Sequence, residues 1–185
     1  MKELSLNILD IAQNSIKAGA AHIDVLLDET AETLCLTIRD DGCGMTAEVV
    51  RSVTDPFYTT RTTRSVGMGI PLLKLAAEQT GGTFSIESVS EQDDPVRHGT
   101  CVQALFNKNH LDFTPLGDVV STVCTLIQGA PSVDWHFCHT YGEHSAAVDT
   151  AEMRQVLGDV PLDSFEVLDW IRQSLLEEYA GFDTQ

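Results

Sequence analysis

The sequence predicts an α+β protein: a two-layer α/β sandwich, with a mixed sheet covered by helices on one face, plus a small C-terminal α/β unit. Stretches in which apolar and polar residues alternate, as in strands, are interspersed with stretches that repeat apolar residues every three or four positions, as in helices. The chain has 185 residues, of which 43% are hydrophobic, enough for a full core and a small annex. A polar segment at 107–118 is expected to link two domains, 1–108 and 109–185.

Each element of the first domain follows from its local pattern. In the stretch 3–18, Leu4, Ile8 and Ile11 form one stripe of a helix, and Gly19 is a suitable helix end. The later segments repeat the two patterns, with a loop rich in hydroxyl side chains at 55–69. Strands are expected at 22–28, 33–39, 83–89 and 100–106, and further helices at 46–53 and 70–80.

The second domain is expected to contain a helix near 117–128, a hairpin at 132–148, and helices at 149–157 and 164–180. Its hairpin is rich in residue types that bind zinc. Their spacing lacks a CxxC or HxxxH pair, and alternation along a strand separates them onto opposite faces. Ordinary surface histidines are therefore favoured over a metal site, and a phosphoacceptor histidine is a further alternative. The residues concerned are His136, Cys138, His139 and His144.

The composition restricts the classes of partner. A formal net charge of −17 repels nucleic acid, so DNA is not expected as the main partner. No run of about 18 apolar residues occurs and the N-terminus lacks the pattern of a signal peptide, so no membrane association is expected. The five cysteines are scattered and form no CxxC pair, which indicates reduced thiols and a cytoplasmic location.

Five short motifs follow one another along the first domain. Asp10 and Asn14 lie one helical turn apart, so their side chains point the same way. Alone, this pair is more typical of a solvated helix face than of a site, and an acidic glycine-rich turn is more typical of an ordinary strand end. The other four motifs are "DDGCG" (40–44), "DPFYTTR" (55–61), "GMG" (67–69) and "HGT" (98–100).

In this order, the motifs resemble those of the Bergerat-fold (GHKL) ATPases, the superfamily of gyrase, heat-shock chaperone, histidine kinase and mismatch-repair ATPase. The resemblance covers residues 3–106. "NSIKAGAAHIDV" and "IRDDGCGM" are most similar to the mismatch-repair ATPases, whereas "DPFYTTR" and "VGMGIPLLK" are similar to the histidine kinases. The resemblance implies ATP and Mg²⁺ as cofactors. The sequence has no P-loop motif GxxxxGK[ST].

The resemblance also implies a role for each motif residue. Asp40 is expected to accept a hydrogen bond from the exocyclic amine of adenine, and Thr100 to add a water-mediated contact. Asn14 is the implied magnesium ligand, since a hard cation prefers oxygen. The remaining implied contacts are Gly42 and Gly44 beside the base, and Arg61, Arg64, Gly67, Met68 and Gly69 beside the phosphates.

Asp10 is the implied catalytic residue. In the hydrolysing branches of the superfamily, a glutamate stands four residues before the magnesium asparagine and activates water. The shorter aspartate of this chain either orients water less well or only orders the water shell of the metal. Two further positions depart from the superfamily patterns: Ser65 replaces the first glycine found in many kinases, and Lys17 replaces an acid of the mismatch-repair enzymes.

The expected function is that of a stand-alone Mg-ATP-binding protein, a regulatory or signalling kinase-like subunit that acts on a protein partner or phosphoacceptor. The chain begins directly in the ATP domain, without an upstream helical segment that carries a histidine, which favours this over a full sensor kinase. Two alternatives stay open. One is a slow ATPase that works as a conformational clamp, with a homodimer in its closed state, and the other is a nucleotide-sensing module without catalysis.

Overall fold

The computed structural model describes residues 3–54 and 68–182. The predicted helices and strands are all present, with ends that differ from expectation by one to two residues at most positions. The elements run α1 (Leu4–Lys17), β1 (His22–Glu29), β2 (Thr33–Asp40), α2 (Ala47–Thr54), α3 (Gly69–Gln79), β3 (Thr83–Val89), β4 (Gly99–Asn107), α4 (Val119–Gly129), β5 (Asp134–Tyr141), β6 (His144–Asp149), α5 (Thr150–Leu157) and α6 (Phe165–Ala180).

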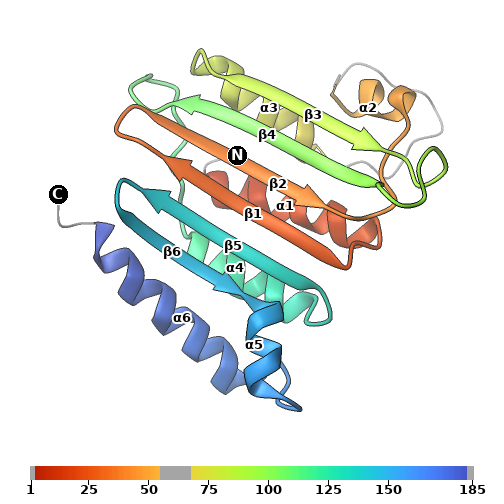
Figure 1. The fold of residues 1–185 in the computed structure, drawn as a ribbon. Helices are drawn as coiled ribbons and strands as arrows, with labels where there is room; N and C mark the ends of the chain where they lie inside the picture. Colours follow the sequence, from red (N-terminus) through yellow and green to blue (C-terminus); the bar gives the residue numbers. More distant parts are fainter. Residues whose placement is uncertain (1–2, 55–67, 183–185) are drawn as a thin grey trace.

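One six-stranded sheet organises the described chain, in the order β3-β4-β2-β1-β5-β6 (Figure 1). Neighbouring strands are antiparallel except β1 and β5, which are parallel. The sheet is therefore mixed, as predicted. Parallel neighbours need a crossover connection, and here the intervening chain between β1 and β5 includes three further helices and three further strands.

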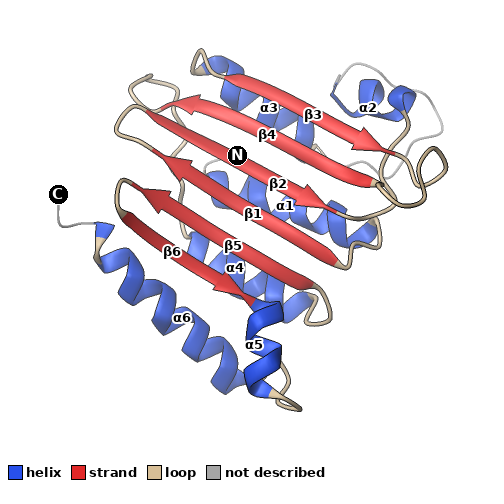
Figure 2. Ribbon diagram, viewed as in Figure 1, coloured by secondary structure: helices blue, strands red, loops and turns tan. Residues whose placement is uncertain are grey.

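Helices α1, α3 and α4 cover one face of the sheet, and the other face carries no helix among the described residues (Figure 2). Alternation along the strands produces this arrangement, because every second residue of β1 and β2 is buried against the helices. The largest fully buried side chains include Phe106, Phe137, Leu4, Ile8, Leu36 and Leu73. The predicted two-layer α/β sandwich with helices on one face is confirmed.

The C-terminal segment adds its two strands, β5 and β6, to the sheet formed by the N-terminal segment. The β5–β6 hairpin pairs with β1 through a full register from His22–Asp134 to Glu29–Tyr141, and α6 packs on β6 and α4. One hydrophobic core cluster includes buried residues from both sides of the linker, such as Ile23 and Trp135. The division into domains at 108/109 stays a prediction. In the structure, the segments on the two sides of this boundary contribute strands to the same sheet.

None of the described helices combines the length and the apolar character needed to cross a lipid bilayer.

Candidate functional site

A pocket of about 390 Å³ lies between α1, the ends of β2 and β4, and the turn that follows β2. Its volume falls in the range of sites for small molecules. It combines an apolar wall with a few polar groups. The lining residues are Ile11, Asn14, Ser15, Lys17, Ala18, Ile38, Asp40, Cys43, Gly44, Met45, Ile70, Thr100 and Val102. The structure thus brings together the predicted site residues Asn14, Asp40, Gly44 and Thr100, which are distant in the sequence.

Asp40, the last residue of β2, is held at both carboxylate oxygens. The hydroxyl of Ser15 donates to Oδ2 over 2.5 Å, and the backbone amide of Gly42 donates to Oδ1 over 3.0 Å. A carboxylate has about four acceptor positions, so two remain for a ligand. Ser15 is only 3% exposed and its position on α1 is set by the core, so the orientation of the Asp40 carboxylate is fixed before any ligand arrives.

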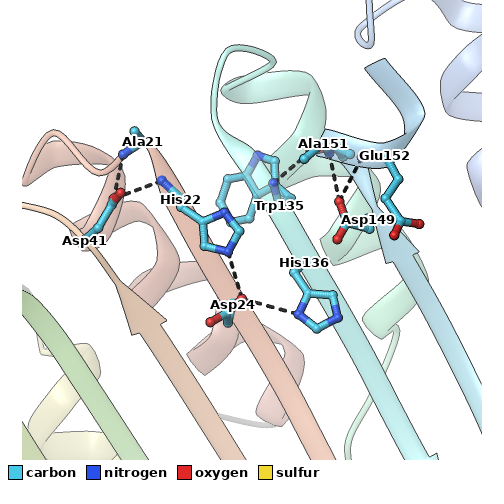
Figure 3. Close-up of polar contacts among 10 residues, drawn as sticks. Ala21, His22, Asp24, Asp41, Trp135, His136, Asp149, Ala151 and Glu152 are labelled. Carbon is cyan, nitrogen blue, oxygen red and sulfur yellow. Dashed lines mark hydrogen bonds and ion pairs between the residues drawn. The ribbon is translucent and has the colours of Figure 1, made fainter. Parts of the chain in front are cut away.

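The neighbouring Asp41 stabilises the turn rather than lining the pocket. Its Oδ1 accepts from the backbone amides of Ala21 and His22, over 2.8 and 2.9 Å, and ties the turn to the beginning of β1 (Figure 3). The first aspartate of "DDGCG" therefore faces the pocket and the second one anchors the loop.

The glycines of the turn permit a close approach that no other residue allows. Gly44 has φ of 65°, and a side chain there would collide with the carbonyl of Val89. Gly42 is buried, and its carbonyl accepts a 2.6 Å hydrogen bond from Nδ1 of His98. This contact implies a proton on Nδ1 of His98, because a carbonyl oxygen only accepts. The turn after β2 is thereby fastened to the start of β4.

Thr100 is positioned by Ser88, its register partner on β3. The Ser88 hydroxyl lies 3.0 Å from the carbonyl of Gly99, to which it donates, and accepts from the Met45 amide over 2.8 Å. The Thr100 hydroxyl lies 2.8 Å from the Ser88 hydroxyl. Since the one proton of Ser88 is directed at Gly99, Thr100 donates to Ser88, and its own oxygen remains an acceptor on the pocket wall.

Asp10 lies outside the lining of the pocket and next to the N-terminus of α3. A Cβ added at Gly69 would be 3.0 Å from the Cβ of Asp10, so the two backbones are close. Asp10 is exposed, as is Met68, which is the N-cap residue of α3. The remaining predicted phosphate contacts, Arg61, Arg64 and Gly67, lie outside the described residues.

Within the described chain, no group of three or more His, Cys, Asp or Glu side chains is placed to hold a metal ion. Asn14, half-buried in the pocket wall, offers an amide oxygen. A single protein oxygen suits magnesium, which keeps several waters and completes its octahedral shell with phosphate oxygens.

Sequence reasoning assigned no contact at this site to four residues: Ser15, Lys17, Ser88 and His98. Lys17 is the only cation among the lining residues of this pocket in the described chain. Lys17 is three positions after Asn14 and Ser15 is four positions after Ile11, so the helical spacing could have indicated both. Ser88 and His98 act through strand pairing and a loop contact, for which a single sequence carries no signal.

The hairpin histidines differ from the expectation of ordinary surface residues at one position. His139 is buried, with 2% exposure, whereas His136 is on the open face of the sheet beside Asp24, over 3.3 Å (Figure 3). The Nε2 of His139 is 2.8 Å from Glu29, and its Nδ1 is 2.8 Å from the hydroxyl of Tyr179. The expectation failed because polar partners on β1 and α6, far away in sequence, satisfy the ring.

Comparison with known proteins assigns the family. The model of the histidine kinase-, DNA gyrase B-, and HSP90-like ATPase family matches residues 2–110. This chain belongs to that family. The predicted superfamily is thereby confirmed, and the matched segment contains every element that lines the pocket.

Curated relatives of this histidine kinase-like ATPase domain include sensor kinases. The heme sensor protein HssS of Staphylococcus saprophyticus is 36% identical over 82 residues, which cover 43% of this chain and 18% of that protein. The sensor histidine kinase ZraS of Escherichia coli is 27% identical over 84 residues, which cover 44% of this chain and 18% of that protein. The chain thus matches less than a quarter of the length of either relative.

Solved structures show the same fold over more of this ATPase-family chain. The MutL ATPase domain of Aquifex aeolicus, complexed with ADP, matches 96% of this chain and 70% of that chain, with a TM-score of 0.55 and 12% identity. The N-terminal domain of a DNA repair protein matches 80% of this chain and 52% of that chain, with a TM-score of 0.53 and 15% identity. At these identities the likeness concerns the fold alone.

Proposed function

We propose that this chain binds Mg-ATP in the pocket beside Asp40 and acts as a regulatory or signalling kinase-like subunit on a protein partner. Membership of the histidine kinase-like ATPase family supports nucleotide binding. The single observation that carries the proposal is the Asp40 carboxylate, held by Ser15 and Gly42 on the wall of a pocket of nucleotide size.

Adenine is the base that this wall suits. A carboxylate accepts hydrogen bonds and repels other acceptors, so Asp40 favours the exocyclic amine of adenine over the carbonyl that guanine has in its place. Thr100 presents an acceptor to a bridging water, because its proton is committed to Ser88. The apolar side chains Ile38, Ile70 and Val102 offer a surface against which the flat base packs.

The phosphates are expected between Asn14, Lys17 and the N-terminus of α3. Asn14 would supply one oxygen to magnesium, which neutralises phosphate charge when bound. Lys17 adds a cation in a chain whose net charge of −17 otherwise repels a polyanion. The first residues of the 11-residue helix α3 contribute amides and the positive end of the helix dipole.

Asp10 is the residue proposed to act on the attacking group. It lies against Gly69 at the N-terminus of α3, on the same side of α1 as Asn14. There it can orient a water molecule, as the second candidate function, a slow ATPase that works as a conformational clamp, would require. It can equally orient the acceptor group of a partner protein. A nucleotide-sensing module would need no such group.

Single-turnover assays with Mg²⁺ and γ-labelled ATP distinguish these functions. Released phosphate indicates the clamp, label on an added partner protein indicates the kinase, and binding without either indicates the sensor. Asp10→Asn keeps the size of the side chain, and we expect it to lower turnover by about 10²-fold or more while ATP still binds. Asp169→Asn, an exposed acid on α6, is the matched control. Equal turnover by Asp10→Asn and the parent would exclude Asp10 from the reaction.

A further inference from the structure

A second cavity, of about 700 Å³, lies at the other end of the molecule, between β6, α5 and α6. Most of its lining is apolar, and part of this lining faces solvent. Val156 is 88% exposed, Trp170 is 59% exposed and Val160 is 49% exposed. A tryptophan at such a position is unusual on a surface that stays in water and is typical of interface centres.

Acidic side chains surround this groove, and no Lys or Arg lines it. Two of the four acids are already engaged. Asp149 caps α5 by accepting from the amides of Ala151 and Glu152 (Figure 3), and Glu178 accepts from the amide of Ala147 over 2.8 Å. Glu152 and Glu166 are exposed, and neither carboxylate has a partner within the described part of the chain.

The contact between Glu178 and Ala147 also restricts how a partner can bind. β6 is an edge strand of the sheet, and edge strands commonly accept a further strand. Here the outward amide of Ala147, at the middle of β6, is taken by a side chain of α6. An added strand would have to displace this contact, whereas a helix laid into the groove between α5 and α6 would leave it intact.

We propose that this groove binds an amphipathic helical segment of a partner protein, with large apolar side chains on one face and Lys or Arg beside them. The apolar side chains pack against Val156, Val160 and Trp170, and the cations pair with Glu152 and Glu166. Charge complementarity selects this occupant. A second copy of the chain would bring its own net charge of −17 against an acidic rim, which opposes self-association.

The test uses the full chain and three synthetic peptides of equal length. The first peptide has Leu at helical i, i+3, i+4 and i+7 positions and Lys elsewhere. The second replaces each Lys with Glu, and the third is a scrambled version of the first, with the same charge and no apolar face. Titration calorimetry measures the affinities, and the fluorescence of the exposed Trp170 reports the place of binding, because Trp135 is buried.

We expect the Leu/Lys peptide to bind at least tenfold more tightly than either other peptide, and to change Trp170 fluorescence. Glu152→Lys with Glu166→Lys should weaken this binding at least tenfold, and so should Trp170→Ala. Glu87→Lys with Glu91→Lys, which reverses two exposed acids at the far side of the sheet, is the control and should retain most of the affinity. Circular dichroism verifies that each variant is folded.

Three outcomes would overturn the proposal. If the ordered and scrambled basic peptides bind with equal affinity, the binding is unspecific charge attraction. Equal losses of peptide affinity in the groove variants and in the control variant would lead to the same conclusion. Sedimentation equilibrium that shows a dimer which Trp170→Ala dissociates would assign the groove to a second copy. None of these measurements involves ATP, so the result is independent of the proposed nucleotide site.

Discussion

The hydroxyl of Ser15 lies 2.5 Å from Oδ2 of Asp40, so α1 and the end of β2 are joined at the group proposed to recognise adenine. Hydrogen bonds to ionised groups contribute more than neutral ones, and this one both stabilises the carboxylate and fixes its direction. Ser15 also lies next to Asn14, the proposed magnesium ligand. The same turn of α1 therefore sets the positions of the two ends of the proposed ligand.

Removal of that hydroxyl is predicted to weaken nucleotide binding without unfolding the chain. In Ser15→Ala, the Asp40 carboxylate loses one of two fixed contacts and gains freedom to turn. We expect ATP affinity to fall by about tenfold, corresponding to the ~1.5 kcal/mol typical of a hydrogen bond to a charged group. Titration calorimetry measures the change, with Ser85→Ala on the open face of the sheet as control. Unchanged affinity in Ser15→Ala would show that Asp40 needs no such support.

Gly44 is predicted to be required for folding of the turn. Its φ of 65° is unfavourable for alanine, and the added methyl group would strike the carbonyl of Val89. We expect Gly44→Ala to cost at least about 2 kcal/mol of unfolding free energy, or a melting temperature lower by about 4–8 °C. Gly129→Ala, where no atom lies near the new Cβ and φ is not positive, should change stability little. Equal melting temperatures for the two variants would contradict the structure of the turn.

The buried contact of His139 with Glu29 predicts a specific dependence of stability on pH. Burial alone raises the pKa of Glu29, but hydrogen bonds from His139 and Lys108 and their charges outweigh it, and the net pKa is lower than its ordinary value of 4.5. A carboxyl with a lowered pKa in the folded state stabilises the fold above its unfolded pKa, and this stabilisation is lost as pH falls through the folded value.

We therefore expect urea midpoints of the parent to decrease as pH is lowered from about 5 to 3, and Glu29→Gln to show a shallower decrease and a lower midpoint at pH 7. The hydroxyl of Tyr179, whose pKa is raised by burial, lies 2.8 Å from Nδ1 of His139 and completes the set of contacts around this ring. The control is Glu48→Gln on the exposed side of α2. If the urea midpoints of the parent and of Glu29→Gln decrease in parallel as pH is lowered, Glu29 does not contribute to the loss of stability in acid.

Much of the fold was predictable because local patterns decide it. Alternating burial placed β1 and β2 to within one residue, since one face of the sheet is solvated and the other is covered. The i, i+4 spacing on α1 likewise predicted that Asp10 and Asn14 share a side of the helix. The pocket then adds the non-local fact that Asn14, Asp40 and Thr100 meet.

The rest depends on pairings that a single sequence does not reveal. Nothing in the alternation of the hairpin indicates that β5 joins β1, so the C-terminal segment was expected as a separate unit. His139 was expected at the surface because its partners, Glu29 and Tyr179, are more than 35 residues away along the chain. Ser88 became part of the site only through its register with Thr100.

We propose above all that Asp40 recognises adenine in a nucleotide-binding pocket. Titration calorimetry of ATP, ADP and GTP in the presence of Mg²⁺, on the parent and on Asp40→Asn, tests this most directly. We predict that the parent binds ATP and ADP but not GTP, and that Asp40→Asn, folded by circular dichroism, loses at least about tenfold in adenine-nucleotide affinity. Failure of the parent to bind ATP, or equal ATP affinity in Asp40→Asn, would contradict the account.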